Sequence, residues 1–145
     1  MKKKRQIVGV LGLLVNHENK FLITLRNDPQ SKRNHLKWEI PGGKIEHGED
    51  PINTLARELQ EEIGVRVEPL QLLPGIGSIL WEDEGSRAHI LLLCYLCRIK
   101  EGTIHLDRKE AIDFRWIRSE ELTMLPFLPF TDTFIHLAED FLSKK

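Results

Sequence analysis

Residues 42–65, GGKIEHGEDPINTLARELQEEIGV, constrain the fold of this chain more than any other stretch. Asp50 is a residue type that caps helix N-termini, and Pro51 suits the first helical position. Gly64 suits a helix stop, because glycine readily adopts the left-handed conformation found there. The spacing therefore predicts a helix over residues 51–63.

The predicted helix carries an apolar stripe with the spacing i, i+3, i+4, i+7, i+11, which packs one helix face against a core. The stripe consists of Ile52, Leu55, Ala56, Leu59 and Ile63. One face of the helix is therefore expected to be buried.

Glu58, Glu61 and Glu62 fall within an arc of about 100° on the same helix, roughly 120° around from the apolar stripe. Like charges at this spacing repel one another, so their grouping favours a cation among them, and carboxylate oxygens suit Mg²⁺ or Mn²⁺. The alternative is a solvated acidic face balanced by Arg57, which lies four residues before Glu61.

The spacing of the whole stretch favours the first interpretation. Gly43 is followed after five residues by Glu49 and after seven more by the run RELQEEIGV at residues 57–65. This register matches every fixed position of the Nudix hydrolase signature, so the chain resembles that family over about residues 36–66. The sequence WEIPGGKIE at residues 38–46 is most similar to the MutT branch, whose members hydrolyse nucleoside triphosphates.

The resemblance implies a set of metal ligands. These are the carbonyl oxygen of Gly42 and the side chains of Glu58, Glu61 and Glu62. Glu110 joins them, because related enzymes carry a metal-associated glutamate about six residues before a tryptophan, here Trp116. Mg²⁺ is the expected ion, with Mn²⁺ as a substitute.

The resemblance also implies catalytic roles. Glu61 or Glu110 accepts the proton of the attacking water, and the choice between them stays open. Arg57 orients the glutamates through a salt bridge, and Glu49 steadies the junction of loop and helix or holds a water.

Five residues are candidates for substrate contacts: Arg26, Glu39, Lys44, Arg87 and Asp132. Arg26 could instead be an exposed arginine at a strand end, and Asp132 could be the N-cap of the last helix. Enzymes of the MutT type that are specific for 8-oxoguanine read the base with an asparagine before that helix, and this chain has none after residue 53. We therefore expect only a modest preference among bases.

Hydrophobic patterning predicts the remaining elements. Residues 7–15 and 21–25 are expected to form a β-hairpin around the polar turn 16–19, followed by a surface loop over residues 27–37. Further strands are expected at 38–40, 65–73, 76–81, from residue 87 onward and at 114–117, with a helical turn at 119–122 and an amphipathic helix at 132–142. This order indicates an α/β fold with a mixed sheet, and the resemblance implies the Nudix-type α/β/α sandwich.

The length of 145 residues fits one domain spanning residues 1–145, with residues 1–5 as a flexible basic terminus. The net charge of −1 gives no reason to expect a stable nucleic-acid partner. No apolar segment is long enough for a bilayer and no signal-peptide pattern is present, so we expect a cytoplasmic protein without a membrane partner. The sequence does not indicate an oligomeric state.

Cys94 and Cys97 form a C-x-x-C pair inside the apolar strand candidate at residues 88–98. Residues three apart on a strand point to opposite faces, so the two thiols are poorly placed to share a metal ion. We expect two buried free cysteines rather than a zinc or redox site.

The sequence and the resemblance thus predict a Mg²⁺-dependent pyrophosphohydrolase that cleaves a nucleoside diphosphate linked to another group, above all a nucleoside triphosphate to the monophosphate and pyrophosphate, with oxidised nucleotides among the candidate substrates. Two alternatives are open. Another Nudix substrate class, such as dinucleoside polyphosphates, ADP-ribose or nucleotide sugars, would use the same chemistry. A non-catalytic nucleotide-binding regulator would belong to a different functional class, although such domains usually lose acidic positions that this chain keeps.

Overall fold

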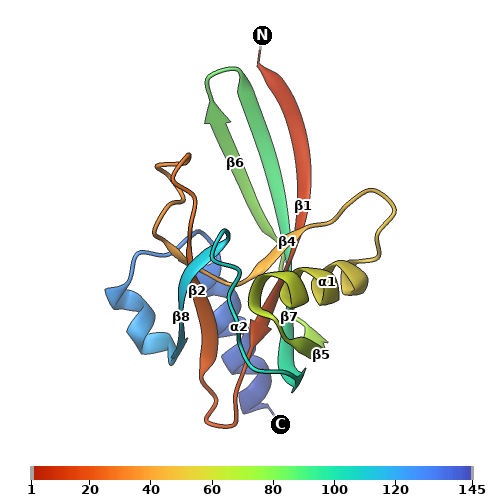
Figure 1. The fold of residues 1–145 in the computed structure, drawn as a ribbon, viewed down its shortest axis with the longest axis vertical. Coiled ribbons are helices and arrows are strands. Elements are labelled where there is room, and N and C mark those ends of the chain that lie inside the picture. Colours follow the sequence, from red (N-terminus) through yellow and green to blue (C-terminus); the bar gives the residue numbers. More distant parts are fainter. Residues whose placement is uncertain (1, 145) are drawn as a thin grey trace.

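A computed structural model describes residues 2–144, which fold into two β-sheets and two main helices (Figure 1). The five-stranded sheet has the order β4 (Gly42–Lys44), β1 (Lys3–Leu14), β7 (Ser86–Glu101) and β5 (Arg66–Leu72), and β6 (Gly77–Asp83) also pairs with β7. The three-stranded sheet has the order β3 (Trp38–Glu39), β2 (Phe21–Arg26) and β8 (Ala111–Ile117). Because β1 and β7 are parallel and the other pairs antiparallel, the fold belongs to the expected α/β class with a mixed sheet.

Two apolar clusters lie on opposite sides of the long strands. On β1, for example, Leu13 belongs to one cluster and the next residue, Leu14, to the other. The first cluster includes residues of α2 (Thr131–Ser143), and the second includes residues of α1 (Pro51–Ile63). The expected closing helix is thus confirmed, and each helix covers a different side of the strands.

The ends of α1 are those predicted. The Asp50 side chain accepts a hydrogen bond of 2.9 Å from the backbone N–H of Ile52. Gly64 adopts a φ of 74°, and its N–H donates to the carbonyl oxygen of Gln60 at 3.1 Å. Local capping chemistry therefore sets both helix boundaries.

The buried face of α1 differs from the predicted stripe. Leu55, Leu59 and Ile63 are fully buried, but Ile52 and Ala56 are exposed, so the prediction was wrong for these two residues. The buried face includes Thr54 and Glu62 instead. The helix packs over Gly12 of β1, where an added Cβ would lie 2.4 Å from Leu59 Cδ1 and 2.8 Å from Leu55 Cδ1. Ile52 and Ala56 are exposed and lie outside this contact.

The predicted hairpin of the first two strands was wrong. The turn exists, since the Asn16 side chain accepts N–H groups from Glu18 and Lys20, but β1 and β2 belong to different sheets and meet only at the bridge between Val15 and Phe21. Consecutive residues on both strands are buried on both faces. An apolar run of this kind does not indicate which neighbour a strand pairs with.

Lys3, Lys4 and Arg5 were expected to be flexible, but the structure includes them in β1, where they pair with Ser86, Arg87 and Ala88 of β7. Met1 and Lys145 of the expected domain lie outside the described residues. The outer halves of β1 and β7 extend with β6 beyond the rest of the molecule as a three-stranded ribbon (Figure 1).

The remaining elements follow the predictions closely. The helical turn is a 3-10 helix, η1 (Ser119–Met124), in which the Glu121 side chain accepts the N–H of Arg118 at 2.8 Å. Strand β8 begins at Ala111 rather than at residue 114. Cys94 and Cys97 are buried and free, and they belong to clusters on opposite sides of β7. Within residues 2–144, no helix is long and apolar enough to cross a membrane.

Candidate active site

A cavity of about 400 Å³ lies beside the ribbon and brings together residues from distant parts of the chain. Its polar end holds six of the predicted site residues: Arg26, Glu39, Gly42, Lys44, Glu58 and Glu110. Its apolar wall includes Ile79 and Trp81 of β6 and Ile90 and Leu92 of β7. An apolar slot with a few convergent charged groups is the usual form of a small-molecule site.

The two glycines at the start of β4 allow its backbone to pass close to its neighbours. A Cβ at Gly42 would lie 2.1 Å from the carbonyl oxygen of Val10, and a Cβ at Gly43 would lie 2.2 Å from Cδ of Glu58. Neither glycine is among those with positive φ. Close approach, rather than a turn conformation, therefore excludes side chains here, and it places the Glu58 carboxylate directly over the Gly43 backbone.

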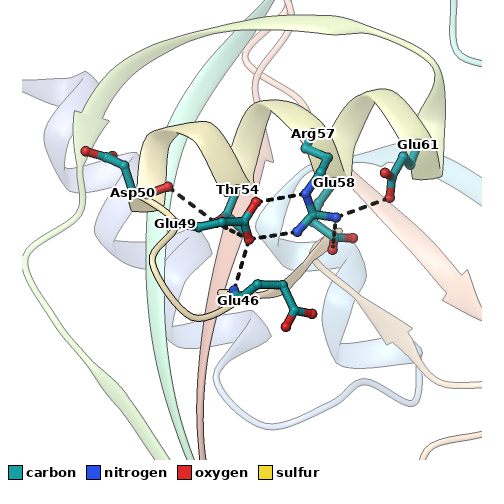
Figure 2. A network of polar contacts seen from close by, with 7 residues as sticks. All are labelled: Glu46, Glu49, Asp50, Thr54, Arg57, Glu58 and Glu61. Carbon is teal, nitrogen blue, oxygen red and sulfur yellow. Dashed lines mark hydrogen bonds and ion pairs between the residues drawn. The ribbon is translucent and has the colours of Figure 1, made fainter.

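Arg57 is the centre of a network of polar contacts between α1 and the loop before it (Figure 2). Its Nε and Nη2 donate to the two carboxylate oxygens of Glu49, both at 3.0 Å. Its Nη1 donates to Glu58 at 3.1 Å and to Glu61 at 3.4 Å. One guanidinium thus holds three carboxylates in a fixed relation, and a bidentate pair of this kind is a geometrically specific contact.

The hydrogen bonds from Arg57 are the main reason why the pKa of Glu49 falls to about 2, and the N–H of Glu46 and the Thr54 hydroxyl act in the same direction. Glu49 is therefore ionised throughout the physiological range. It joins the loop before α1 to the helix, as the sequence led us to expect.

Glu62 is 7% exposed, and burial raises the pKa of its carboxyl well above the usual range, helped by the charges of Glu39 and Glu110. The N–H of Gly42 opposes this rise by a hydrogen bond. Burial likewise raises the pKa of Glu39 to about 7, although Arg26 donates to it at 3.1 and 3.4 Å.

Burial is also the main cause of a raised pKa at Glu58, despite the neighbouring Arg57. The charges of Glu61 and Glu110 act in the same direction. Carboxylates from β3, α1 and the connection before β8 therefore repel one another around one end of the cavity.

This end of the cavity fits a divalent cation. The donors are carboxylate oxygens with the nearby Gly42 backbone, the hard ligands that Mg²⁺ and Mn²⁺ prefer, and a cation would relieve the repulsion that raises their pKa values. In the described part of the chain, no three Asp, Glu, His or Cys side chains form a complete metal-binding group as they stand. The carboxylates are close enough to raise one another's pKa values, but their oxygens do not surround a single position.

The three glutamates of α1 do not share one environment. Glu62 is buried, Glu58 is half-buried and the Glu61 side chain is 60% exposed, because their arc runs from the core side of the helix to its solvent side. Glu61 contacts Arg57, and neither Glu61 nor Glu62 is among the residues that line the cavity. The arc predicted from the sequence therefore spans a buried, a half-buried and an exposed position.

Two of the predicted substrate contacts also lie away from the cavity. Arg87 pairs with Glu82 on the ribbon at 3.5 Å, and Asp132 lies in the first turn of α2. Asp132 is not the N-cap of that helix, because Phe130 occupies this position with a φ of 74°. Its neighbour Thr131 lines the cavity instead. Arg26 is not a free strand-end arginine, because it pairs with both Glu39 and Asp28.

The apolar wall of the cavity was not predicted from the sequence. The alternation of Ile79 and Trp81 around Leu80 was the available signal, since it places the first two on one face of β6 and Leu80 on the other, where it is 51% exposed. Which face would line a cavity depends on pairing with β7, which the local pattern does not contain.

The sequence and the fold of this chain are similar to those of known proteins. A family model described as NUDIX domain matches residues 3–138. The 8-oxo-dGTP diphosphatase of Escherichia coli (strain K12) is 38% identical over 100 residues, covering 69% of this chain and 70% of that protein. The crystal structure of the MutT protein from Methanosarcina mazei Go1 is similar with a TM-score of 0.70 and 25% identity, covering 99% of this chain and 98% of the other.

Some relatives are longer than this chain. The mouse protein named nucleoside diphosphate-linked moiety X motif 6 is 33% identical over 120 residues, which cover 79% of this chain but 36% of that protein. The similarity there concerns the domain alone. Because the family model matches far more than half of the sequence, the chain belongs to the Nudix family, as a MutT-like hydrolase of phosphoric anhydride bonds.

Proposed function

We propose that the protein is a Mg²⁺-dependent pyrophosphohydrolase that converts nucleoside triphosphates to the monophosphate and pyrophosphate, with Mn²⁺ as a substitute ion. The observation that carries this proposal is the composition of the cavity. Carboxylates and the cations Arg26 and Lys44 line this cavity together with an apolar wall that includes Trp81. A polyphosphate and a base attached to one sugar need these two environments side by side.

The residues that would hold the cation are Glu58, Glu62, Glu110 and the carbonyl oxygen of Gly42. When bound, a divalent cation neutralises phosphate charge and activates water for attack. Lys44 has no ion pair in residues 2–144, so its ammonium is available to a phosphate.

The general base is one of two glutamates. Glu110 lines the cavity, whereas Glu61 points to solvent and contacts Arg57. We therefore assign the proton-accepting role to Glu110, which takes the proton of the attacking water as the bond to the leaving pyrophosphate breaks. Arg57 and Glu49 act through the helix, by holding the Glu58 carboxylate in place.

The test is a hydrolysis screen of dGTP, dCTP, dATP, 8-oxo-dGTP, diadenosine tetraphosphate and ADP-ribose, with Mg²⁺, with Mn²⁺ and with chelator. We expect metal-dependent release of monophosphate and pyrophosphate from triphosphates, with a preference for 8-oxo-dGTP below about 10³-fold, or some 4 kcal/mol. Turnover of only the last two substrates would assign another Nudix class. Binding without turnover of any substrate would indicate a regulatory domain.

The assignment of the general base is tested with Glu110→Gln and Glu61→Gln in parallel. We expect Glu110→Gln to lower kcat at least about 10²-fold, and Glu61→Gln to have a smaller effect. The reverse order would return the role to Glu61. Glu62→Gln should abolish Mg²⁺-dependent turnover while the protein stays folded.

A further inference from the structure

One residue of the surface loop at 27–37 reaches across to the ribbon. The Arg33 guanidinium carbon lies 5.2 Å from the centroid of the Trp81 ring. Its Nη2 donates to the backbone oxygen of Glu82 and to Oδ1 of Asp83, both at 3.3 Å. Trp81 lines the cavity, whereas Arg33 is not among the lining residues, so the Trp81 side chain contacts both the cavity and the guanidinium.

The loop that carries Arg33 is itself folded. The carbonyl oxygen of Ser31 accepts N–H groups from Asn34 and His35, and the His35 ring accepts the N–H of Asp28 at 2.9 Å. At the base of the loop, the backbone of Arg26 bonds to Leu36 and Lys37. A hydrogen-bonded loop therefore carries Arg33 to β6, and its base is at Arg26, which lines the cavity.

We propose that Arg33 is a positioning residue for nucleotide binding, because it fixes the Trp81 ring in the orientation on which a nucleobase stacks. This inference rests on the proposed function. Stacking on an aromatic side chain is sequence-tolerant and contributes substantially to nucleotide affinity. A ring already immobilised by a cation–π contact loses less rotamer freedom when the base arrives, so pre-ordering tightens binding without touching the phosphates.

The guanidinium suits this role better than an ammonium would. It is flat enough to stack over the indole, and its fork can donate to two oxygens while it stacks. Its two oxygen partners lie on consecutive residues directly after Trp81, so they fix Arg33 over the ring rather than beside it.

The experiment compares Arg33→Met, which keeps the length of the side chain but removes charge and fork, with Lys32→Met as the matched control. Lys32 is exposed and has no ion pair or side-chain hydrogen bond in residues 2–144. For Arg33→Met we expect the KM for dGTP to rise roughly 2- to 12-fold, the range that corresponds to ordering one side chain, with kcat changed less than about 2-fold. Lys32→Met should leave both constants unchanged.

A double-mutant cycle with Trp81→Leu separates positioning from a general effect on the loop. Trp81→Leu keeps an apolar wall but removes the stacking ring, so Arg33→Met should have no further effect on KM in that background. An equal effect of Arg33→Met with and without Trp81 would overturn the proposal, as would a loss confined to kcat. Arg33→Lys should restore part of the affinity through the remaining cation–π contact.

Binding of dGMP without metal, measured by calorimetry on the same variants, separates this inference from the proposed function. If the wild type hydrolyses no triphosphate and the Arg33→Met variant binds dGMP more weakly than the wild type does, only the proposed function fails. If dGMP binds equally to wild type and Arg33→Met, the positioning role fails whatever the activity is. Thermal unfolding of each variant confirms that the compared proteins are folded.

Discussion

Replacing Glu39 with glutamine is expected to stabilise the metal-free protein at neutral pH. Glu39 has a side chain that is 16% exposed, and burial together with the charge of Glu110 raises its pKa from 4.5 to about 7 against the opposing effect of Arg26. Glutamine has the shape of the protonated form and keeps an oxygen for Arg26, which also keeps its contact with Asp28. The substitution removes the charge and leaves the contacts.

The magnitude follows from linkage between proton binding and folding. Since the folded protein holds this proton more tightly than the unfolded chain does, Glu39 favours folding most below about pH 4.5, and that stability is lost as the pH rises through about 7. At about 1.4 kcal/mol per pKa unit, the shift makes wild type less stable than Glu39→Gln by about 3 kcal/mol near pH 8 and by about 1 kcal/mol near pH 5.

Urea unfolding in the presence of chelator at these two pH values measures the difference. Glu68→Gln on exposed β5 is the control, and its free energy of unfolding should stay within about 0.5 kcal/mol of wild type. A variant that is no more stable than wild type near pH 8, or a gain that is the same at both pH values, would refute the electrostatic reasoning. Added Mg²⁺ should then stabilise wild type more than the variant, because the cation offsets the same repulsion.

Two further substitutions test the packing and the network around α1. Gly12→Ala should lower the free energy of unfolding by about 1–3 kcal/mol, because the new methyl group would meet Leu59 Cδ1 at 2.4 Å, and urea unfolding at pH 7 measures this loss. Arg57→Met should lower kcat by about 10- to 100-fold by releasing Glu49 and Glu58, which steady-state kinetics at saturating Mg²⁺ can detect. Unchanged turnover in Arg57→Met would show that the helix alone orients Glu58.

Local chemistry explains what could be predicted from the sequence. Asp50, Pro51 and Gly64 act within a few residues of α1, so its boundaries follow from the chain itself. The pairing partners of β1 and β2 could not be predicted, since both strands are apolar on both faces and nothing local distinguishes a hairpin from two separate sheets.

In the candidate site, too, features set by local spacing could be predicted, and features set by distant contacts could not. The signature spacing identified Glu58, Glu61 and Glu62, but not that one would be buried and another exposed, because the rotation of α1 is set by its contact with Gly12 on a distant strand. Trp81 was missed as part of the cavity wall for the same reason. Its environment is created by β7 and by a loop some fifty residues earlier in the chain.

Glu110 lies far from α1 in the sequence, but its spacing of six residues before Trp116 predicted it as a site residue, and it lines the cavity together with Glu58. It directly precedes β8, and the connection before it is attached to α1 because the N–H of Asp107 donates to the carbonyl oxygen of Glu62. The carbonyl oxygen of Glu110 in turn accepts the N–H of Asn27, whose side chain donates to the backbone of Arg108. A fixed distance along β8 therefore becomes a fixed position in the cavity.

Asn27 is also the first residue of the loop that carries Arg33. The backbone that places Glu110 in the cavity is thus bonded to the loop whose Arg33 contacts Trp81. Arg33→Met removes the contact with Trp81 but none of the hydrogen bonds that join Asn27 to Glu110 and Arg108, so its effect is expected on KM rather than on kcat.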